Sequence, residues 1–293
     1  MRPEPRRGRQ LLTSRRAAVL GSPVGHSLSP VLHEAGYAAA GLPDWSYGRH
    51  ECEEGGLAPF VAGLDETWRG LSLTMPLKVV ALDVADDVSD LAREAGGVNT
   101  LVRTESGWTG DNTDVHGIVA ALREATGERR PGPGRATVIG AGATARSALL
   151  ALRTLGAGEV RVAARRLDRA AALGDTPGVE VVPVPLETWA RAPGGLVVST
   201  VPADAGSAVA AALDRPDEDL LRATTLLDVV YAGWPTPLAR AAAARGATVV
   251  SGLEMLLHQA AEQFALFTGV PAPLGAMRAA GRAALHGGAP ADT

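Results

Sequence analysis

The chain has 293 residues, 46% of them hydrophobic, and a formal net charge of −4. This length suggests two domains of roughly 150 residues each, with ample apolar side chains for packed cores. The slight acidity excludes a broad electrostatic attraction to nucleic acid or to an anionic membrane, and the single cysteine, Cys52, cannot form an internal disulfide, which fits a reducing cytosol.

Paired arginines near the N-terminus, Arg6-Arg7 and Arg15-Arg16, resemble an export signal only faintly. Such a signal needs an apolar stretch of roughly 7–15 residues after the charges, and here Gly21 and Pro23 break the stretch early. We interpret residues 1–15 as a disordered basic arm. No segment approaches the roughly 20 apolar residues of a membrane span. The single cysteine, which fits a reducing cytosol, predicts a cytoplasmic protein.

The first part of the chain alternates short apolar strands with helices. Ser29 and Pro30 form an N-cap followed by a first-turn proline, which predicts a helix start. Pro76 is expected to open another helix, with Lys78 in its first turn. The pattern predicts strands at 16–20, 45–51, 70–75 and 98–102, a hairpin turn at Ser106-Gly107, and helices at 30–40, 56–64, 87–95 and 113–125.

The composition changes at residues 126–134, a linker rich in glycine, proline and charge. Beyond it, alanine-rich helices separate apolar runs at 136–139, 159–164, 179–184, 195–201, 225–230 and 247–250. Short buried strands that alternate with helices indicate a parallel sheet covered on both faces. No strand follows the last two predicted helices, 252–268 and 274–286, so we expect them to pack back on the first domain.

Lys78 is the only lysine in the chain, against twenty-seven arginines. An arginine stays protonated under all protein conditions, whereas an amine can be tuned to gain and lose a proton. Lys78 is therefore a candidate for proton transfer, and the alternative is a surface lysine without a role.

A glycine-rich segment connects the strand at 136–139 to the next helix, and it consists of Gly140, Ala141, Gly142, Ala143, Thr144 and Ala145. The pattern G-x-G-x-x-A between a strand and a helix is the dinucleotide-binding fingerprint. Its glycines allow a tight turn and a close approach of the backbone to a diphosphate, which the helix N-terminus also attracts. The alternative is a glycine-rich turn without a ligand.

The end of the following strand distinguishes between dinucleotides. An enzyme specific for NAD usually places an acidic residue there, but here the strand ends in Arg165 and Arg166, with Arg169 one turn later. Asp168 lies slightly too late to bind the ribose. Guanidinium groups suit a 2′-phosphate, so NADP is favoured over NAD; the alternative is a solvated arginine-rich turn.

Five further segments resemble, in order, motifs of the shikimate dehydrogenases. They are residues 26–30 (His-Ser-Leu-Ser-Pro), 72–78 (Ser-Leu-Thr-Met-Pro-Leu-Lys), 97–100 (Gly-Val-Asn-Thr), 110–114 (Gly-Asp-Asn-Thr-Asp) and 251–260 (Ser-Gly-Leu-Glu-Met-Leu-Leu-His-Gln-Ala). With the glycine-rich segment, the resemblance covers roughly residues 17–270. It implies NADPH-dependent, reversible reduction of 3-dehydroshikimate to shikimate, on the path to aromatic amino acids.

The resemblance also implies a role for each matching residue. Lys78 and Asp114 would form the proton-transfer pair, and Ser27 and Ser29 would hold the substrate carboxylate. Other substrate contacts would come from Thr74, Asn99, Tyr231 and Gln259, and Gly252 would lie against NADP(H). Hydride arrival at a ketone leaves charge on oxygen, which a positioned ammonium can stabilise and protonate. Because a nearby carboxylate favours the ammonium, we expect Lys78 to be the acid in reduction and Asp114 to orient it.

The implied fold class is α/β with two domains. Residues 1–115 and 252–293 would form a substrate domain around a mainly parallel sheet, and residues 116–251 a Rossmann-type domain that binds NADP(H). The six histidines form no evident metal set, and the sequence shows no nucleic-acid module. It leaves both a monomer and a homodimer open.

Several positions depart from the family pattern. Ser72 stands where many members have Asn, and Val115-His116 follows Asp114 where glycine is common. Ala164 and Arg166 replace the usual Asn and Thr beside the arginine expected at the 2′-phosphate. Two alternatives remain. One is a quinate or aminoshikimate dehydrogenase with the same fold, although the pair Ser27 and Ser29 argues against quinate as the substrate. The other is a non-catalytic dinucleotide-binding sensor.

Overall fold

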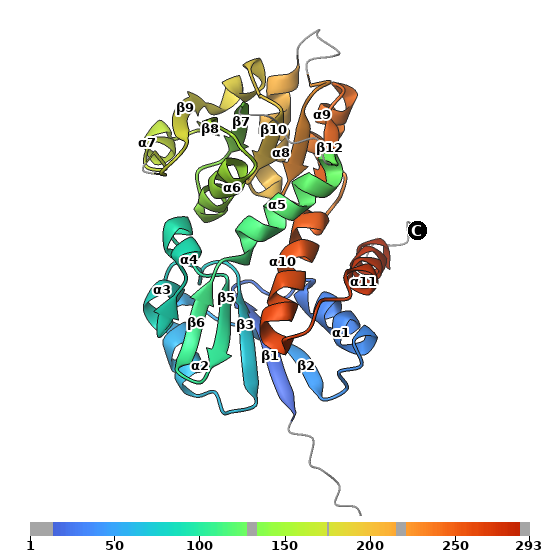
Figure 1. Ribbon diagram of the computed structural model, residues 1–293. Coiled ribbons are helices and arrows are strands. Elements are labelled where there is room, and N and C mark those ends of the chain that lie inside the picture. Colours follow the sequence, from blue (N-terminus) through green and yellow to red (C-terminus); the bar gives the residue numbers. More distant parts are fainter. Residues whose placement is uncertain (1–13, 128–133, 175, 215–220, 288–293) are drawn as a thin grey trace, which may run out of the picture.

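The computed structural model describes residues 14–127, 134–174, 176–214 and 221–287. In this part of the chain, two six-stranded sheets each carry their own helices, and two long helices pass between them (Figure 1). The expected basic arm and linker fall almost entirely outside the described residues, so both stay predictions.

The first sheet is mixed, in the strand order β2-β1-β3-β5-β6-β4. Three of its pairings are parallel, β1 with β2, β1 with β3 and β4 with β6, whereas β5 is antiparallel to both β3 and β6. The strands are β1 (Arg15–Gly21), β2 (Trp45–Glu51), β3 (Trp68–Leu73), β4 (Asp87–Val88), β5 (Thr100–Thr104) and β6 (Gly107–Asp111). Its short helices are α1 (Ser29–Ala39), η1 (Glu54–Gly56), α2 (Leu57–Ala62), α3 (Ala81–Val84) and α4 (Asp90–Ala95).

The second sheet is parallel throughout, in the order β12-β11-β10-β7-β8-β9. The strand order reverses direction next to β7, and the crevice at such a point is the usual ligand site of an open parallel sheet. The strands are β7 (Arg135–Ile139), β8 (Glu159–Ala164), β9 (Glu180–Pro185), β10 (Leu196–Ser199), β11 (Thr225–Asp228) and β12 (Thr248–Ser251). The helices are α6 (Ala143–Thr154), α7 (Leu167–Ala171), η2 (Leu186–Arg191), η3 (Ala203–Ala205), α8 (Gly206–Ala210), η4 (Ala211–Leu213) and α9 (Pro237–Ala244).

Helices α5 (Thr113–Thr126) and α10 (Gly252–Thr268) pass between the two halves and pack against each other (Figure 1). The last helix, α11 (Leu274–Gly287), lies against α1 and α10, which confirms the expectation that the C-terminal helices return to the first half. Among the described residues, none of the helices combines the length and the hydrophobicity needed to cross a membrane.

Most predicted strands and helices are confirmed within two residues, but three assignments were wrong. Pro76 opens a series of turns, and the helix starts only at Ala81. The Lys78 carbonyl accepts from the Val98 N–H at 2.8 Å, so it bonds to a distant segment and not within a helix. Residues 87–88 form an edge strand, and α4 begins only after its N-cap, Ser89. Ser29 does not cap α1, because the N-cap is Leu28 and makes no side-chain cap bond.

An aromatic cluster forms the core between α1, β2 and α10. The His33 ring stacks on Tyr47, with centroids 4.1 Å apart and an 11° angle between the planes. Phe264 and Phe267 stack on the same imidazole at 6.3 and 5.9 Å. Burial lowers the pKa of His33 to about 3, although its neighbour Gln263 acts in the opposite direction. His33 is therefore a neutral core residue at physiological pH.

This depressed pKa makes stability depend on pH. Between pH 6.5 and about 3, His33 is protonated in the unfolded chain but stays neutral in the folded chain. Stability from this source is fully present above pH 6.5 and falls by about 1.4 kcal/mol per pH unit as the solution is acidified. We expect urea unfolding to report a loss of roughly 2 kcal/mol at pH 5.0 relative to pH 7.5. His33→Phe should lose this part of the slope, and an identical pH dependence in both proteins would contradict the assignment.

Candidate active site

A cleft of about 300 Å³ lies where the two halves meet, and both halves contribute to its walls. The first half provides Ser27, Ser29, Ser72, Thr74, Lys78, Asn99 and Asp114, the second half provides Thr144, Val229 and Tyr231, and α10 provides Gly252, Met255, Leu256, Gln259 and Gln263. All eight side chains that the sequence singled out for proton transfer or substrate contact are in this set. Segments far apart in the chain therefore converge on one cavity.

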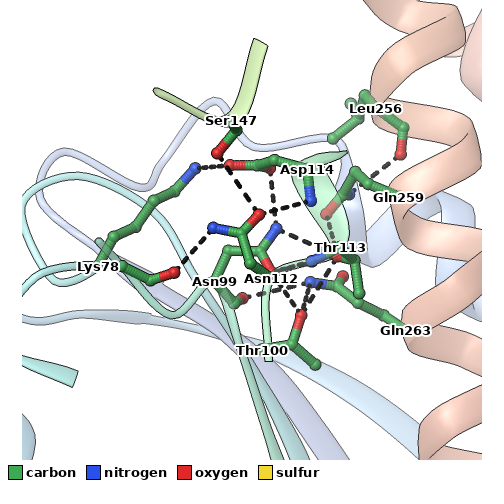
Figure 2. A network of polar contacts seen from close by, with 11 residues as sticks. Lys78, Asn99, Thr100, Asn112, Thr113, Asp114, Ser147, Leu256, Gln259 and Gln263 are labelled. Carbon is green, nitrogen blue, oxygen red and sulfur yellow. Dashed lines mark hydrogen bonds and ion pairs between the residues drawn. The ribbon is translucent and has the colours of Figure 1, made fainter. Parts of the chain in front are cut away.

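An ion pair lies in the wall of the cleft. Lys78 Nζ is 2.5 Å from Asp114 Oδ2, and the two side chains are 19% and 7% exposed (Figure 2). Asp114 is the second residue of α5, where the partial positive charge of the helix terminus favours a carboxylate. Its backbone N–H donates to the N-cap side chain, Asn112 Oδ1, at 3.1 Å. The helix start thus fixes the position of the Asp114 carboxylate.

Asn99 holds the other oxygen of this carboxylate. Its Nδ2 donates to Asp114 Oδ1 at 2.8 Å, while its Oδ1 accepts from the backbone N–H of Thr113 at 2.8 Å and from Thr100 Oγ1 at 2.7 Å (Figure 2). Because a backbone N–H can only donate, the Thr113 contact fixes which side of the Asn99 amide faces the carboxylate. Both Asp114 oxygens therefore accept from a defined donor.

The opposite part of the cleft is rich in hydroxyl groups. Ser27 Oγ donates to Ser29 Oγ at 3.2 Å, and the carbonyl of Ser27 accepts from Arg49 at 2.7 Å. Tyr231 comes from the second half to the same place: burial raises the pKa of its hydroxyl, while the charge of Arg49 and a backbone contact with Leu28 lower it. Two hydroxyls and a nearby guanidinium suit a ligand carboxylate.

Gln259 reaches the same cavity from α10. Its Oε1 accepts from Thr113 Oγ1 at 3.4 Å, and its Nε2 donates to the carbonyl of Leu256 at 3.0 Å (Figure 2). Thr74 lines the cleft at the end of β3, before the turn that carries Lys78. Polar groups that donate and accept thus surround the ion pair on several sides, as a polyhydroxylated ligand requires.

A second cavity, of about 510 Å³, lies at the carboxyl edge of the parallel sheet. Its lining includes Gly140, Ala141 and Gly142 together with Arg165, Arg166 and Arg169. Gly140 has φ +111°, and a Cβ there would lie 2.4 Å from Thr200 Oγ1, so the turn requires glycine. Gly142 is the N-cap of α6 and has no side chain to cap the helix. The Ala145 N–H donates to the Gly142 carbonyl at 3.0 Å, which leaves the N–H groups of Ala143 and Thr144 for a diphosphate. These residues fit an NADP-type dinucleotide.

The remaining predicted cofactor residues are distributed around the loop. Both Ala143 and Ala145 belong to the first turn of α6, where Ala145 is fully buried and Ala143 is exposed. Thr144 and Gly252 line the first cleft and not the second. Arg166 pairs with Asp168 at 2.6 Å, whereas Arg165 and Arg169 make no ion pair within the described ranges.

Comparisons with known proteins agree with this geometry. Residues 19–101 match the shikimate dehydrogenase substrate binding domain, and residues 252–280 match the shikimate 5'-dehydrogenase C-terminal domain. The chain is 39% identical to a shikimate dehydrogenase (NADP(+)) from Aeropyrum pernix, over 93% of this chain and 98% of that protein. The chain belongs to the shikimate dehydrogenase family.

Solved structures of shikimate dehydrogenases share this fold. The enzyme from Mycobacterium tuberculosis is 43% identical, with a TM-score of 0.81 over 92% of this chain and 99% of that one. The enzyme from Thermus thermophilus, solved in complex with NADP(H) and shikimate, is 37% identical, with a TM-score of 0.80 over 92% of this chain and all of that one. The chain thus has the two-part α/β architecture of this family, with one Rossmann-type sheet.

The sequence did not predict the positions of two residues at or near the cleft of this shikimate dehydrogenase fold, Gln263 and Tyr47. Gln263 lines the cleft one helical turn after Gln259, and that spacing of four on one helix could have revealed it. Tyr47 lies behind the cleft and donates to Ser72 Oγ at 2.6 Å, and no motif marks it. Val115 and His116 lie inside α5, so their departure from the family pattern affects a helix and not a loop.

An ion-pair network ties α5, α10 and α11 together on the surface. Glu124, Glu254 and His258 place ligand-type atoms within 4.8 Å of one another, an arrangement the sequence did not predict. Arg278 contacts both carboxylates, at 2.6 Å and 3.0 Å, and Arg282 contacts Glu254 at 2.9 Å. These guanidinium groups already balance the acidic charge, so the cluster is a structural bridge between helices.

Gly252, the first residue of α10, allows a test of how closely this helix approaches the segment after β11. A Cβ on this residue would lie 2.1 Å from the carbonyl oxygen of Val229, which is backbone that cannot move aside cheaply. We expect Gly252→Ala to cost about 1–3 kcal/mol of stability and to weaken ligand binding in the first cleft, which Gly252 lines. Gly275→Ala in α11 is the control, because its Cβ would meet no atom within 4 Å. Thermal unfolding measures both variants, and equal midpoints would contradict the close approach.

Proposed function

We propose that the protein catalyses the NADPH-dependent, reversible reduction of 3-dehydroshikimate to shikimate, in the shikimate pathway of aromatic amino-acid biosynthesis. The observation that carries this proposal is the Lys78–Asp114 pair, 2.5 Å apart in a cleft whose opposite wall comes from the dinucleotide-binding sheet. Membership of the shikimate dehydrogenase family supports the same substrate. An assay at 340 nm with NADPH and 3-dehydroshikimate tests it directly.

The proposal divides the chain into two functional parts. Residues 1–115 and 252–293 would form the substrate domain, and residues 116–251 the domain that binds NADP(H). Support comes from the two cavities, one at the meeting of the halves and one along the glycine turn and the arginines. Gly140, Ala141, Gly142 and the first turn of α6 would hold the diphosphate, and Arg165 with Arg169 the 2′-phosphate.

When bound, NADPH supplies the hydride for the ketone carbon. The role of the protein is to supply the proton: Lys78 Nζ carries it as an ammonium and donates it to the oxygen on which negative charge develops. Asp114 Oδ2, 2.5 Å away, holds this Nζ in place. In the oxidation direction the same pair takes the proton back from the substrate hydroxyl.

The hydroxyl-rich part of the cleft would bind the rest of the substrate. Ser27 and Ser29 would donate to its carboxylate, with Tyr231 beside them, and the family resemblance supports this role. Thr74, Asn99 and Gln259 would contact the ring hydroxyls and carbonyl. Because Gln259 is held by Thr113 Oγ1 and the Leu256 carbonyl, it can present its remaining N–H and lone pair to the substrate without reorganising.

Lys78→Met tests the proton donor. This variant removes the ammonium and keeps much of the apolar stem, so we expect kcat to fall on the order of 10²–10⁴-fold. NADPH affinity, followed by fluorescence titration, should stay within about twofold of wild type. Lys78→Arg is the matched control: it keeps the positive charge beside Asp114 but cannot release a proton. Full activity in Lys78→Arg would refute the proton-transfer role.

Arg165→Gln tests cofactor selectivity. Arg165 lines the dinucleotide cavity without an ion pair in the described chain, whereas Arg166 is held by Asp168. A charge-assisted hydrogen bond to the 2′-phosphate contributes about 1.5–3 kcal/mol to binding. Its loss should raise KM for NADPH roughly 10- to 100-fold and leave KM for NADH nearly unchanged. Arg166→Gln is the control and should change KM for NADPH less. The reverse ranking would show that Arg166 binds the phosphate.

We also propose that the enzyme works in the cytoplasm on a small-molecule substrate, without a nucleic-acid or membrane partner. The net charge of −4 and the free cysteine support this setting. A monomer and a homodimer are both compatible with the proposal, and light scattering of the purified protein decides between them.

A further inference from the structure

A chain of hydrogen bonds with one fixed direction lies beneath the cleft. Its direction is set at Gln263, whose Nε2 lies 3.3 Å from the carbonyl oxygen of Asn99 (Figure 2). A carbonyl can only accept, so this side of the amide must be the NH₂ group. Gln263 Oε1 therefore faces Ser72, and the Ser72 hydroxyl must donate to it, at 2.7 Å.

This assignment determines the proton of the next hydroxyl as well. A serine has a single O–H proton, and that of Ser72 is committed to Gln263. The Tyr47 hydroxyl, 2.6 Å from Ser72 Oγ, must therefore be the donor of that bond. Burial raises the pKa of Tyr47, so the phenol stays protonated. Ser72 lines the cleft with one remaining lone pair and no free proton.

The other end of the chain leads to the ion pair. Gln263 Nε2 also donates to Thr100 Oγ1 at 2.9 Å, and Thr100 Oγ1 donates to Asn99 Oδ1 at 2.7 Å. Asn99 Nδ2 then donates to Asp114 Oδ1. Every donor from Tyr47 to Asn99 thus points toward the carboxylate that holds Lys78. Tyr47 and Thr100 themselves do not line the cleft.

Tyr47 is held firmly enough to act as the origin of this chain. Its ring stacks on the neutral imidazole of His33, and its backbone N–H donates to Glu34 Oε1 at 2.6 Å. The ring is nearly inaccessible to solvent, with 6% of the residue exposed. The Tyr47 hydroxyl donates its one proton to Ser72 Oγ, and its other polar neighbour is Ser29, whose hydrogen bond also lowers the pKa of Tyr47.

We propose that Tyr47 and Thr100 are positioning residues for the reaction, and that Ser72 consequently accepts a hydrogen bond from a donor group of the substrate, an O–H or N–H on its ring. The inference rests on the proposed function. Tyr47 acts on the substrate through Ser72, and Thr100 acts on Asp114 through Asn99. The two ends of the chain therefore affect different kinetic constants.

Tyr47→Phe removes the first donor without changing the ring that stacks on His33. We expect KM for 3-dehydroshikimate and Kd for shikimate, measured by calorimetry without cofactor, to rise about three- to tenfold, the worth of one neutral hydrogen bond. kcat should stay within about twofold. Tyr37→Phe is the matched control, since Tyr37 lies in the same aromatic cluster and its hydroxyl has no hydrogen-bond partner in the described structure. It should leave both constants unchanged.

A double-mutant cycle with Ser72→Ala separates action through Ser72 from a general loss of packing. If Tyr47 acts through Ser72, adding Tyr47→Phe to Ser72→Ala should not weaken shikimate binding further. Additive losses, or equal losses in Tyr37→Phe and Tyr47→Phe, would overturn the inference.

Thr100→Val tests the other end, and it serves even if Tyr47→Phe does not fold. It keeps the shape of the side chain and removes the hydroxyl between Gln263 and Asn99, so kcat should fall about three- to tenfold with Kd for shikimate nearly unchanged. An unchanged kcat would overturn the role of Thr100. If wild type does not oxidise NADPH with 3-dehydroshikimate, both the proposed function and this inference fail. An active wild type with unaltered variants refutes the inference alone.

Discussion

The contact between Lys78 and Asp114 imposes the strictest requirement on this structure. An ion pair with side chains 19% and 7% exposed loses much of its hydration, and such pairs contribute little to net stability unless further hydrogen bonds compensate. Here the compensation is specific, because Asn99 and the N-terminus of α5 both stabilise the carboxylate. The surrounding strands and helix ends are thus arranged for this pair, and chemistry, more than stability, explains its place.

The two sheets meet the requirement from different directions. The mixed sheet brings the C-terminal ends of β1 and β3 and the start of the antiparallel strand β5 to one side. The segment with Ser27 and Ser29, the turn that carries Lys78, and Asn99 all line the cleft there. The parallel sheet presents its glycine turn and the end of β11 from the other side. A bidentate contact between Glu94 of α4 and Arg153 of α6, with Nη2 to Oε2 at 2.7 Å, connects the two halves. The hydrogen bond from Arg153 lowers the pKa of Glu94, so this contact stays charged.

Local patterns in the sequence predicted most of this fold, because periodicity, caps and the glycine fingerprint are short-range signals. They failed where a distant strand decides the conformation: the turn at Lys78 depends on its bond to Val98, and residues 87–88 pair with β6. The site residues on motifs were found for the same reason. Tyr47 belongs to no motif, and Thr100 ends the 97–100 motif without a role that the sequence assigns to it. The importance of both follows only from which atoms the folded chain places next to Ser72 and Asn99.

Helices α5 and α10 are both the physical connections between the halves and the carriers of Asp114, Gln259 and Gln263 (Figure 1). A change in the angle between the halves therefore turns these side chains with it. The same feature limits recombination between homologues. If the second half of a homologue were joined to this protein within either helix, it would bring foreign residues into the cleft between the halves. Viable chimaeras should have their crossover points outside both helices, so that α5 and α10 come from the same parent as the first sheet.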